Sequence, residues 1–89
     1  MKGNDINLQL RTIYLEAVDN QLQNNDPPET RRTLARLRKL NITERDAKLL
    51  IASAIAVESY EILKTHKPFN RKRYLRHLAA LPDQSFLEE

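Results

Sequence analysis

The segment from residue 44 to about residue 64 is apolar on two opposite sides of the helix that its spacing predicts. One side holds Ala47, Leu50, Ile51, Ala54, Ile55, Val57 and Ile62, and the other holds Leu49, Ala52, Ala56, Tyr60 and Leu63. A helix that is apolar all round must be covered by neighbouring elements on both sides. We therefore expect this helix to lie at the centre of the fold.

Glycine is almost absent from the 89 residues, since Gly3 is the only one. Tight β-hairpin turns usually need glycine at positive φ, and phosphate-binding loops are rich in glycine. Runs of β-branched residues are missing as well. These features predict an all-α fold, a compact four-helix bundle that forms one domain over residues 1–82. Residues 83–89 are expected to be a frayed tail, unless Phe86 and Leu87 dock.

Three further helices are expected, over about residues 4–23, 27–40 and 71–81, because apolar residues recur there at spacings of three and four. In the second of these helices, Thr30 and Thr33 fall on the inward stripe. Their hydroxyls are expected to bond to carbonyls of the preceding turn and to have no function.

Four residues are predicted to cap helix N-termini. Asp26 fits the N-cap position before Pro27, and Glu29 can reach back to the N–H of the cap residue, as in a capping box. Thr43 has the side chain and the position to cap the central helix. Asn70 is expected to cap the last helix in the same way.

Glu58 is the first candidate for a functional site, because it falls among apolar residues of the central helix. A carboxylate there must be paired or protonated. The expected arrangement is a structural ion pair with an arginine of the second helix, Arg31 or Arg32, or plain exposure near the end of the central helix. The functional alternative is a general acid/base or a ligand anchor. No second carboxylate, serine dyad or metal ligand has a spacing that completes a reaction centre, so we expect no enzyme, no catalytic residue and no cofactor.

The two histidines do not predict a metal site. His66 and His77 are eleven residues apart, one in a loop and one in a helix, which is not a metal-ligand spacing. The chain also has no cysteine. His77 is expected at the surface or at a helix edge.

A basic block between residues 62 and 82 is the second candidate. It contains six cations and no acid, a net charge of +6 in a chain whose total is +3. A bound anion would offset the repulsion between the cations at the start of the last helix and the helix dipole. This pattern predicts a weakly sequence-specific phosphate or nucleic-acid surface, and the alternative is a solvated face or an electrostatic contact. The binding residues would be Lys67, Arg71, Lys72, Arg73 and Arg76.

Several motifs resemble a pattern found in small uncharacterised bacterial all-helical proteins. They are the stretch from Asp26 to Glu29 (DPPE), an A-x-E at 56–58, Pro-Phe at 68–69, and Arg-Tyr at 73–74 ahead of Leu-Pro at 81–82. The resemblance covers residues 24–82 and implies a helical fold, with no established activity. This chain differs from the pattern in having a basic run at 71–73, where acidic residues are more usual.

A non-enzymatic role is the leading functional hypothesis. We expect a protein-interaction module that binds a protein partner or a second copy of itself, and nucleic-acid or anion binding through the last helix is the alternative. The N-terminus has no apolar stretch like that of a signal peptide, and no apolar run is long enough to span a membrane. We therefore expect a cytoplasmic protein without a membrane partner.

Overall fold

The structure is a computed structural model that describes the backbone of residues 2–88 and the side chains of residues 10–88. Its helices are α1 (Lys2–Asn24), α2 (Pro28–Lys39), α3 (Glu44–Thr65), α4 (Arg71–Ala80) and the short 3₁₀ helix η1 (Ser85–Glu88). The described residues contain no strand, which confirms the all-α four-helix prediction.

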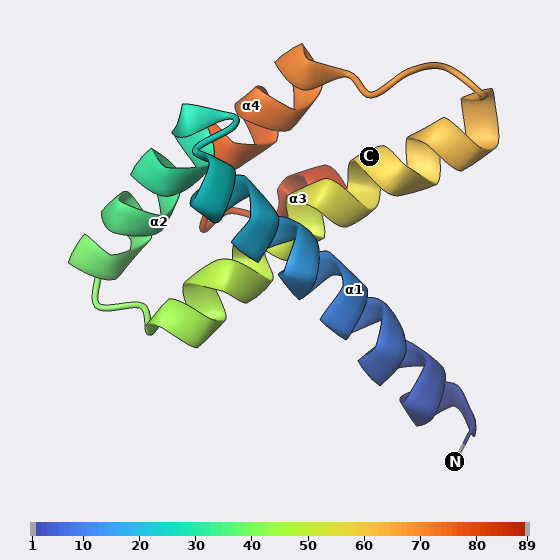
Figure 1. Cartoon of the computed structure of the whole chain (residues 1–89), viewed down its shortest axis with the longest axis horizontal. Helices are drawn as coiled ribbons and strands as arrows, with labels where there is room; N and C mark the ends of the chain where they lie inside the picture. Colours follow the sequence, from blue (N-terminus) through green and yellow to red (C-terminus); the bar gives the residue numbers. More distant parts are fainter. Residues whose placement is uncertain (1, 89) are drawn as a thin grey trace.

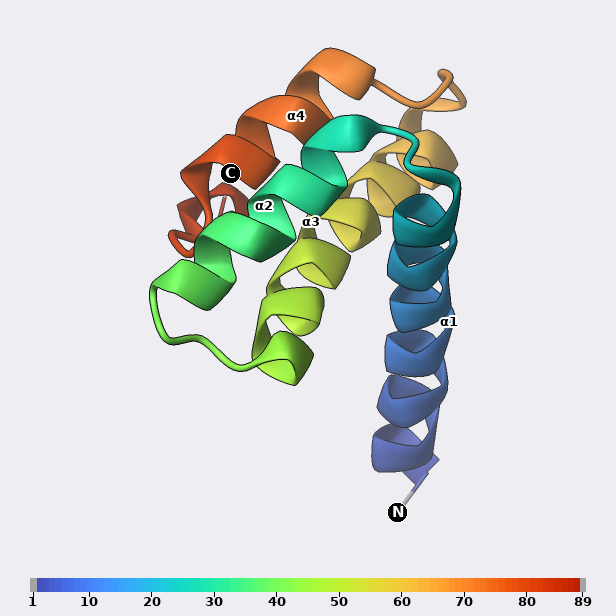
Figure 2. The same cartoon turned by 60° about the vertical axis from the view of Figure 1, so that its left-hand side comes forward.

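Helix α3 lies at the centre, as its two apolar sides predict. It packs against α1, α2 and α4, and α2 and α4 run beside each other (Figures 1 and 2). The N-terminal half of α1 extends beyond the other helices in both views. The core joins all four helices through residues that include Val18, Leu37, Ile51, Tyr74 and Leu78. Full burial of a side chain such as Leu37 contributes about 2 kcal/mol.

The start of α2 differs from the prediction. Helix α2 begins at Pro28, its N-cap residue is Pro27, and no side chain caps it. Asp26 is not the cap because its backbone closes α1 instead. Its N–H donates to the Gln21 carbonyl at 3.0 Å, while Asn25 takes the left-handed conformation with φ of 49°. This is a Schellman-type ending, so the capping box of Asp26 and Glu29 does not form.

The other two predicted caps are present. The Thr43 hydroxyl accepts a hydrogen bond from the N–H of Asp46 at 3.1 Å, at the start of α3. The Asn70 side chain accepts from the N–H of Arg73 at 3.0 Å, at the start of α4. Each bond satisfies one of the N–H groups that a helix leaves without a partner at its start.

The C-terminal segment is docked rather than frayed over residues 83–88. Phe86 is buried and its ring stacks on His77 with a centroid distance of 4.4 Å. Gln84 donates from Nε2 to the Ser53 hydroxyl of α3 at 3.0 Å. Leu87 stays half exposed. One aromatic anchor and one hydrogen bond thus hold this segment beside α3.

Candidate functional site

Glu58 is completely buried, and a cation pairs with it as predicted. Arg73 donates from Nε to Oε2 at 2.7 Å and from Nη2 to Oε1 at 3.0 Å. The backbone N–H of Asn70 donates to Oε1 at 3.3 Å. The hydrogen bond to Glu58 raises the pKa of Arg73 above its ordinary value. The two bonds between the guanidinium and the carboxylate form a bidentate pair, the geometry in which charge-assisted hydrogen bonds are strongest.

The arginine that pairs with Glu58 comes from α4, and not from α2 as the sequence suggested. Arg31 is exposed and donates to the Leu22 carbonyl of α1 at 2.8 Å. Arg32 is also exposed, on the side of α2 that borders α4. After the 66–70 loop the chain turns back along α3, and this return brings Arg73 to Glu58.

Glu58 takes the role that an acidic residue at the third position of α4 would have in a capping box. In that motif the acid at N3 accepts from the N–H of the cap residue. Here N3 is Arg73, and a carboxylate from α3 accepts from Asn70 instead. Both carboxylate oxygens are occupied by these bonds. The geometry assigns Glu58 the structural role of joining α3 to the start of α4.

The basic block does not form one continuous surface. Arg73 turns inward to Glu58, and Arg71 lies 3.7 Å from a carboxylate oxygen of Asp26 and 3.8 Å from one of Glu29. The remaining nominated cations, Lys67, Lys72 and Arg76, are exposed. Two of the five residues proposed to bind phosphate are therefore matched by acids of this chain, which weakens the anion-binding interpretation.

Arg36 of α2 closes the other end of α4. Its guanidinium donates to the carbonyls of Leu81 at 2.6 Å and Leu78 at 2.9 Å. These are among the carbonyls that a helix leaves without partners at its C-terminus. Cations are favoured there by the helix dipole.

A polar cluster joins α1, α2 and α4. Thr30 and Tyr74 both donate to the Gln21 side-chain oxygen at 2.7 Å, and their own oxygens are 3.2 Å apart. Thr30 therefore bonds across helices, which differs from the expected bond to its own preceding turn. Burial raises the pKa of Tyr74 above 10.0, and its bonds to Thr30 and Gln21 oppose this only in part.

His77 is buried and not at the surface, because the docked Phe86 covers it. Within the described part of the chain, no three His, Asp or Glu side chains come together in a way that would hold a metal ion.

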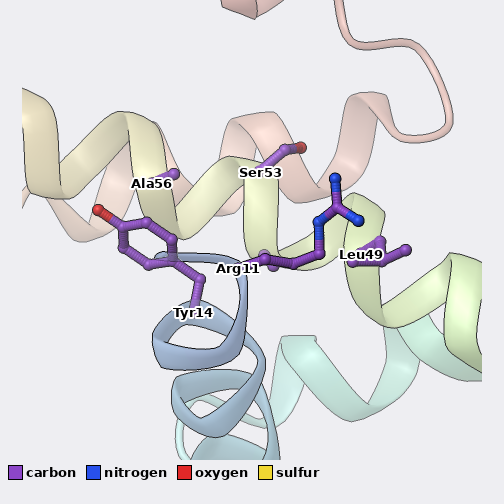
Figure 3. A pocket seen from close by; sticks show the side chains of 6 residues that line it. Arg11, Tyr14, Leu49, Ser53 and Ala56 are labelled. Atoms are coloured by element: carbon purple, nitrogen blue, oxygen red, sulfur yellow. The ribbon is translucent and has the colours of Figure 1, made fainter. Parts of the chain in front are cut away.

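A hollow with a volume of about 410 Å³ lies between α1 and α3. Figure 3 shows Arg11 and Tyr14 of α1 beside the second apolar side of α3. The small side chains of Ala52, Ser53 and Ala56 form the part of its lining that comes from the middle of α3. The full lining consists of Arg11, Tyr14, Leu49, Ala52, Ser53 and Ala56.

A second hollow continues this one along α3. It has a volume of about 260 Å³, shares Ala56 with the first, and is bordered by Tyr60, Glu61 and the docked segment at Phe86 and Leu87. We call the two hollows together the α3 groove. From Leu49 to Tyr60 the groove covers about 16 Å at 1.5 Å per residue, or three helical turns.

The apolar stripe of α3 is exposed at the end of the groove, at Tyr60, and beyond the groove, at Leu63. Tyr60 is 63% exposed and Leu63 is 77% exposed. The sequence predicted that both sides of this helix would be packed, and that is wrong for the second side at its C-terminal half. The sequence shows that this second apolar stripe exists. Whether the stripe is buried or exposed depends on how far α1 and the C-terminal segment extend along α3.

Comparison with known proteins adds no relative, since no family model, curated protein or solved structure matches the chain. Among the described residues, no helix is both long and apolar enough to cross a membrane.

Proposed function

We propose that this protein is a non-enzymatic protein-interaction module that binds a helical segment in the α3 groove. The observation that carries the proposal is the uncovered apolar stripe that leads from the groove to Tyr60 and Leu63. Isolated exposed apolar residues are ordinary, but a contiguous stripe beside a hollow marks an interaction surface.

The shape of the groove favours a helix as ligand. Its length matches three helical turns, and the small side chains of Ala52 and Ala56 allow a second backbone to approach closely. Helix-in-groove recognition uses apolar side chains at spacings of three and four, and the stripe on α3 has the same spacing.

The proposal is tested by an affinity pull-down that uses the wild type and two matched variants as immobilised baits. Ala56→Arg places a long charged side chain in the middle of the groove. Ala35→Arg makes the same change on the exposed face of α2 and is the control. We expect a bound protein to be retained by the wild type and by Ala35→Arg, and to be lost with Ala56→Arg. The purified pair should then show an affinity about tenfold lower or more for Ala56→Arg.

Two outcomes would count against the proposal. One is a set of bound proteins that does not differ between the variants. The other is binding that depends on nucleic acid, seen as loss of all partners after nuclease treatment together with a steep fall of affinity with salt. The second outcome would favour the exposed cations Lys67, Lys72 and Arg76 as the working surface.

A further inference from the structure

The stripe that borders the groove has a symmetric order of side chains. Ala56 is at its middle, Ala52 and Tyr60 are each four residues away, and Leu49 and Leu63 are each seven residues away. Any two positions whose numbers add to 112 are therefore equidistant from Ala56. When two copies of α3 pair antiparallel around Ala56, such positions face each other.

In that pairing, the exposed apolar side chains of one copy meet the lining of the hollow of the other copy. Tyr60 of one copy, which is 63% exposed, lies opposite Ala52 of the second copy, at the floor of its hollow. Leu63 lies opposite Leu49, which lines the same hollow. Both contacts occur twice because of the two-fold symmetry. Each copy thus supplies both the apolar side chains that need cover and the space that receives them.

The charges at the two ends of the groove are complementary in the same pairing. Arg11 borders the groove near Leu49, and Glu61 borders it near Tyr60. Reversing the direction of the second copy places its Glu61 near Arg11 of the first, and its Arg11 near Glu61. A parallel pairing would instead bring like charges together at each end, which is unfavourable.

We propose that the segment bound in the α3 groove is α3 of a second copy of this chain, paired antiparallel on a two-fold axis at Ala56. This inference rests on the proposed function and names its partner. Contacts that use the same patch on both subunits close at two copies and are the commonest oligomer interface.

Cysteine pairing tests the axis directly, because the chain has no cysteine of its own. On the two-fold axis, the residues at position 56 of the two copies come within disulfide reach, about 7 Å between Cα atoms or less. We expect Ala56→Cys to oxidise to a covalent dimer, and the control Ala35→Cys to stay monomeric at the same concentration. Leu49→Cys mixed with Leu63→Cys should form a mixed disulfide, which tests the register.

A charge exchange tests the ends of the interface on the protein without crosslinks. Arg11→Glu and Glu61→Arg should each weaken self-association, measured by sedimentation equilibrium, by about tenfold. The double variant should restore it, and circular dichroism checks that each variant keeps its helices. A monomeric wild type, or an Ala56→Cys variant that does not crosslink faster than Ala35→Cys, would overturn the inference.

These results separate the inference from the proposed function. A monomer that still binds another protein, and loses it with Ala56→Arg, would overturn only the second-copy partner. A monomer with no groove-dependent ligand would overturn both.

Discussion

Glu58 shows how a buried charge is used in a small core. Its carboxylate accepts two hydrogen bonds from Arg73 of α4 and one from the N–H of Asn70, the cap residue of that helix. Arg73 remains 29% exposed, so only the acid is fully removed from water. The net contribution of such a pair to the stability of the fold is small, because both charges lose water on burial. Removing one partner destabilises the fold more strongly, because it leaves the other charge without a counter-ion.

Replacing Glu58 with glutamine should therefore destabilise the fold strongly. Glu58→Gln keeps the shape of the side chain but leaves the Arg73 charge partly buried without a counter-ion. We expect the free energy of unfolding in urea to fall by about 2–4 kcal/mol. The control Glu16→Gln changes an exposed residue of α1 and should cost less than about 0.5 kcal/mol. Equal costs would show that the pair contributes little.

Tyr74 gives a dependence on pH. Its pKa in the folded state is raised above 10.0, so the folded state holds the proton more tightly than the unfolded state. This contribution to stability is complete below pH 10 and is lost as the pH rises through the folded-state pKa. Tyr74→Phe removes the hydroxyl bonds and should cost about 1–2 kcal/mol near neutral pH.

The cost of Tyr74→Phe should shrink above pH 10, because the wild type loses stability there through Tyr74 and the variant does not. Urea unfolding of both proteins at a neutral and an alkaline pH measures this difference. Tyr60→Phe, on an exposed tyrosine, is the control and should have little effect at either pH. A cost that stays constant with pH would contradict the raised pKa.

At this scale the sequence predicts burial better than it predicts partners. The helical wheel places Glu58 on an apolar side, and the structure buries it. The wheel cannot show which helix covers that side, so Arg31 and Arg32 were as plausible as Arg73. Likewise, the burial of His77 depends on Phe86, nine residues later, and no local pattern reports that contact.

At the scale of the helices, the helix starts show which boundaries the sequence predicts. The starts of α3 and α4 follow from Thr43 and Asn70. Each of these side chains accepts a hydrogen bond from the backbone N–H three residues later. The start of α2 was not predictable in the same way. Pro27 and Pro28 are adjacent, and either residue suits the first turn of a helix. Helix α2 begins at the second proline because the N–H of Asp26 is bonded to the Gln21 carbonyl at the end of α1.

The two kinds of helix start should respond differently to alanine. Thr43→Ala removes a side-chain cap and should lower the free energy of unfolding by about 1 kcal/mol. Asp26→Ala removes a side chain that is 76% exposed and whose ion-pair contact, to Arg71, is long at 3.7 Å. We therefore expect the free energy of unfolding to fall by less than about 0.5 kcal/mol. Urea unfolding compares the two. An equal loss for Asp26→Ala would mean that it caps α2 after all.

The whole molecule leaves one side of its central helix incompletely covered. Helices α1, α2 and α4 all pack against α3, but α1 and the C-terminal segment leave the α3 groove open. The order of helices and the central position of α3 were predictable from apolar spacing. The groove was not, because it depends on the crossing of α1 over α3.

Self-association should couple to the stability of the fold. When a second copy binds only the folded chain, the urea midpoint rises with protein concentration. We expect this rise for the wild type and for Ala35→Arg, and a midpoint independent of concentration for Ala56→Arg. A wild-type midpoint that does not change with concentration would contradict the second-copy partner.

The closure of α4 by Glu58 at one end and Arg36 at the other has a consequence for folding order. A helix of ten residues is too short to persist alone, and this one depends on α3 and α2 to satisfy the groups at its ends. We therefore expect α4 to become stable only after its two neighbours have met. Its amide protons should therefore exchange with solvent through a partial opening that leaves α2 and α3 folded, and faster than the amide protons in the middle of α3.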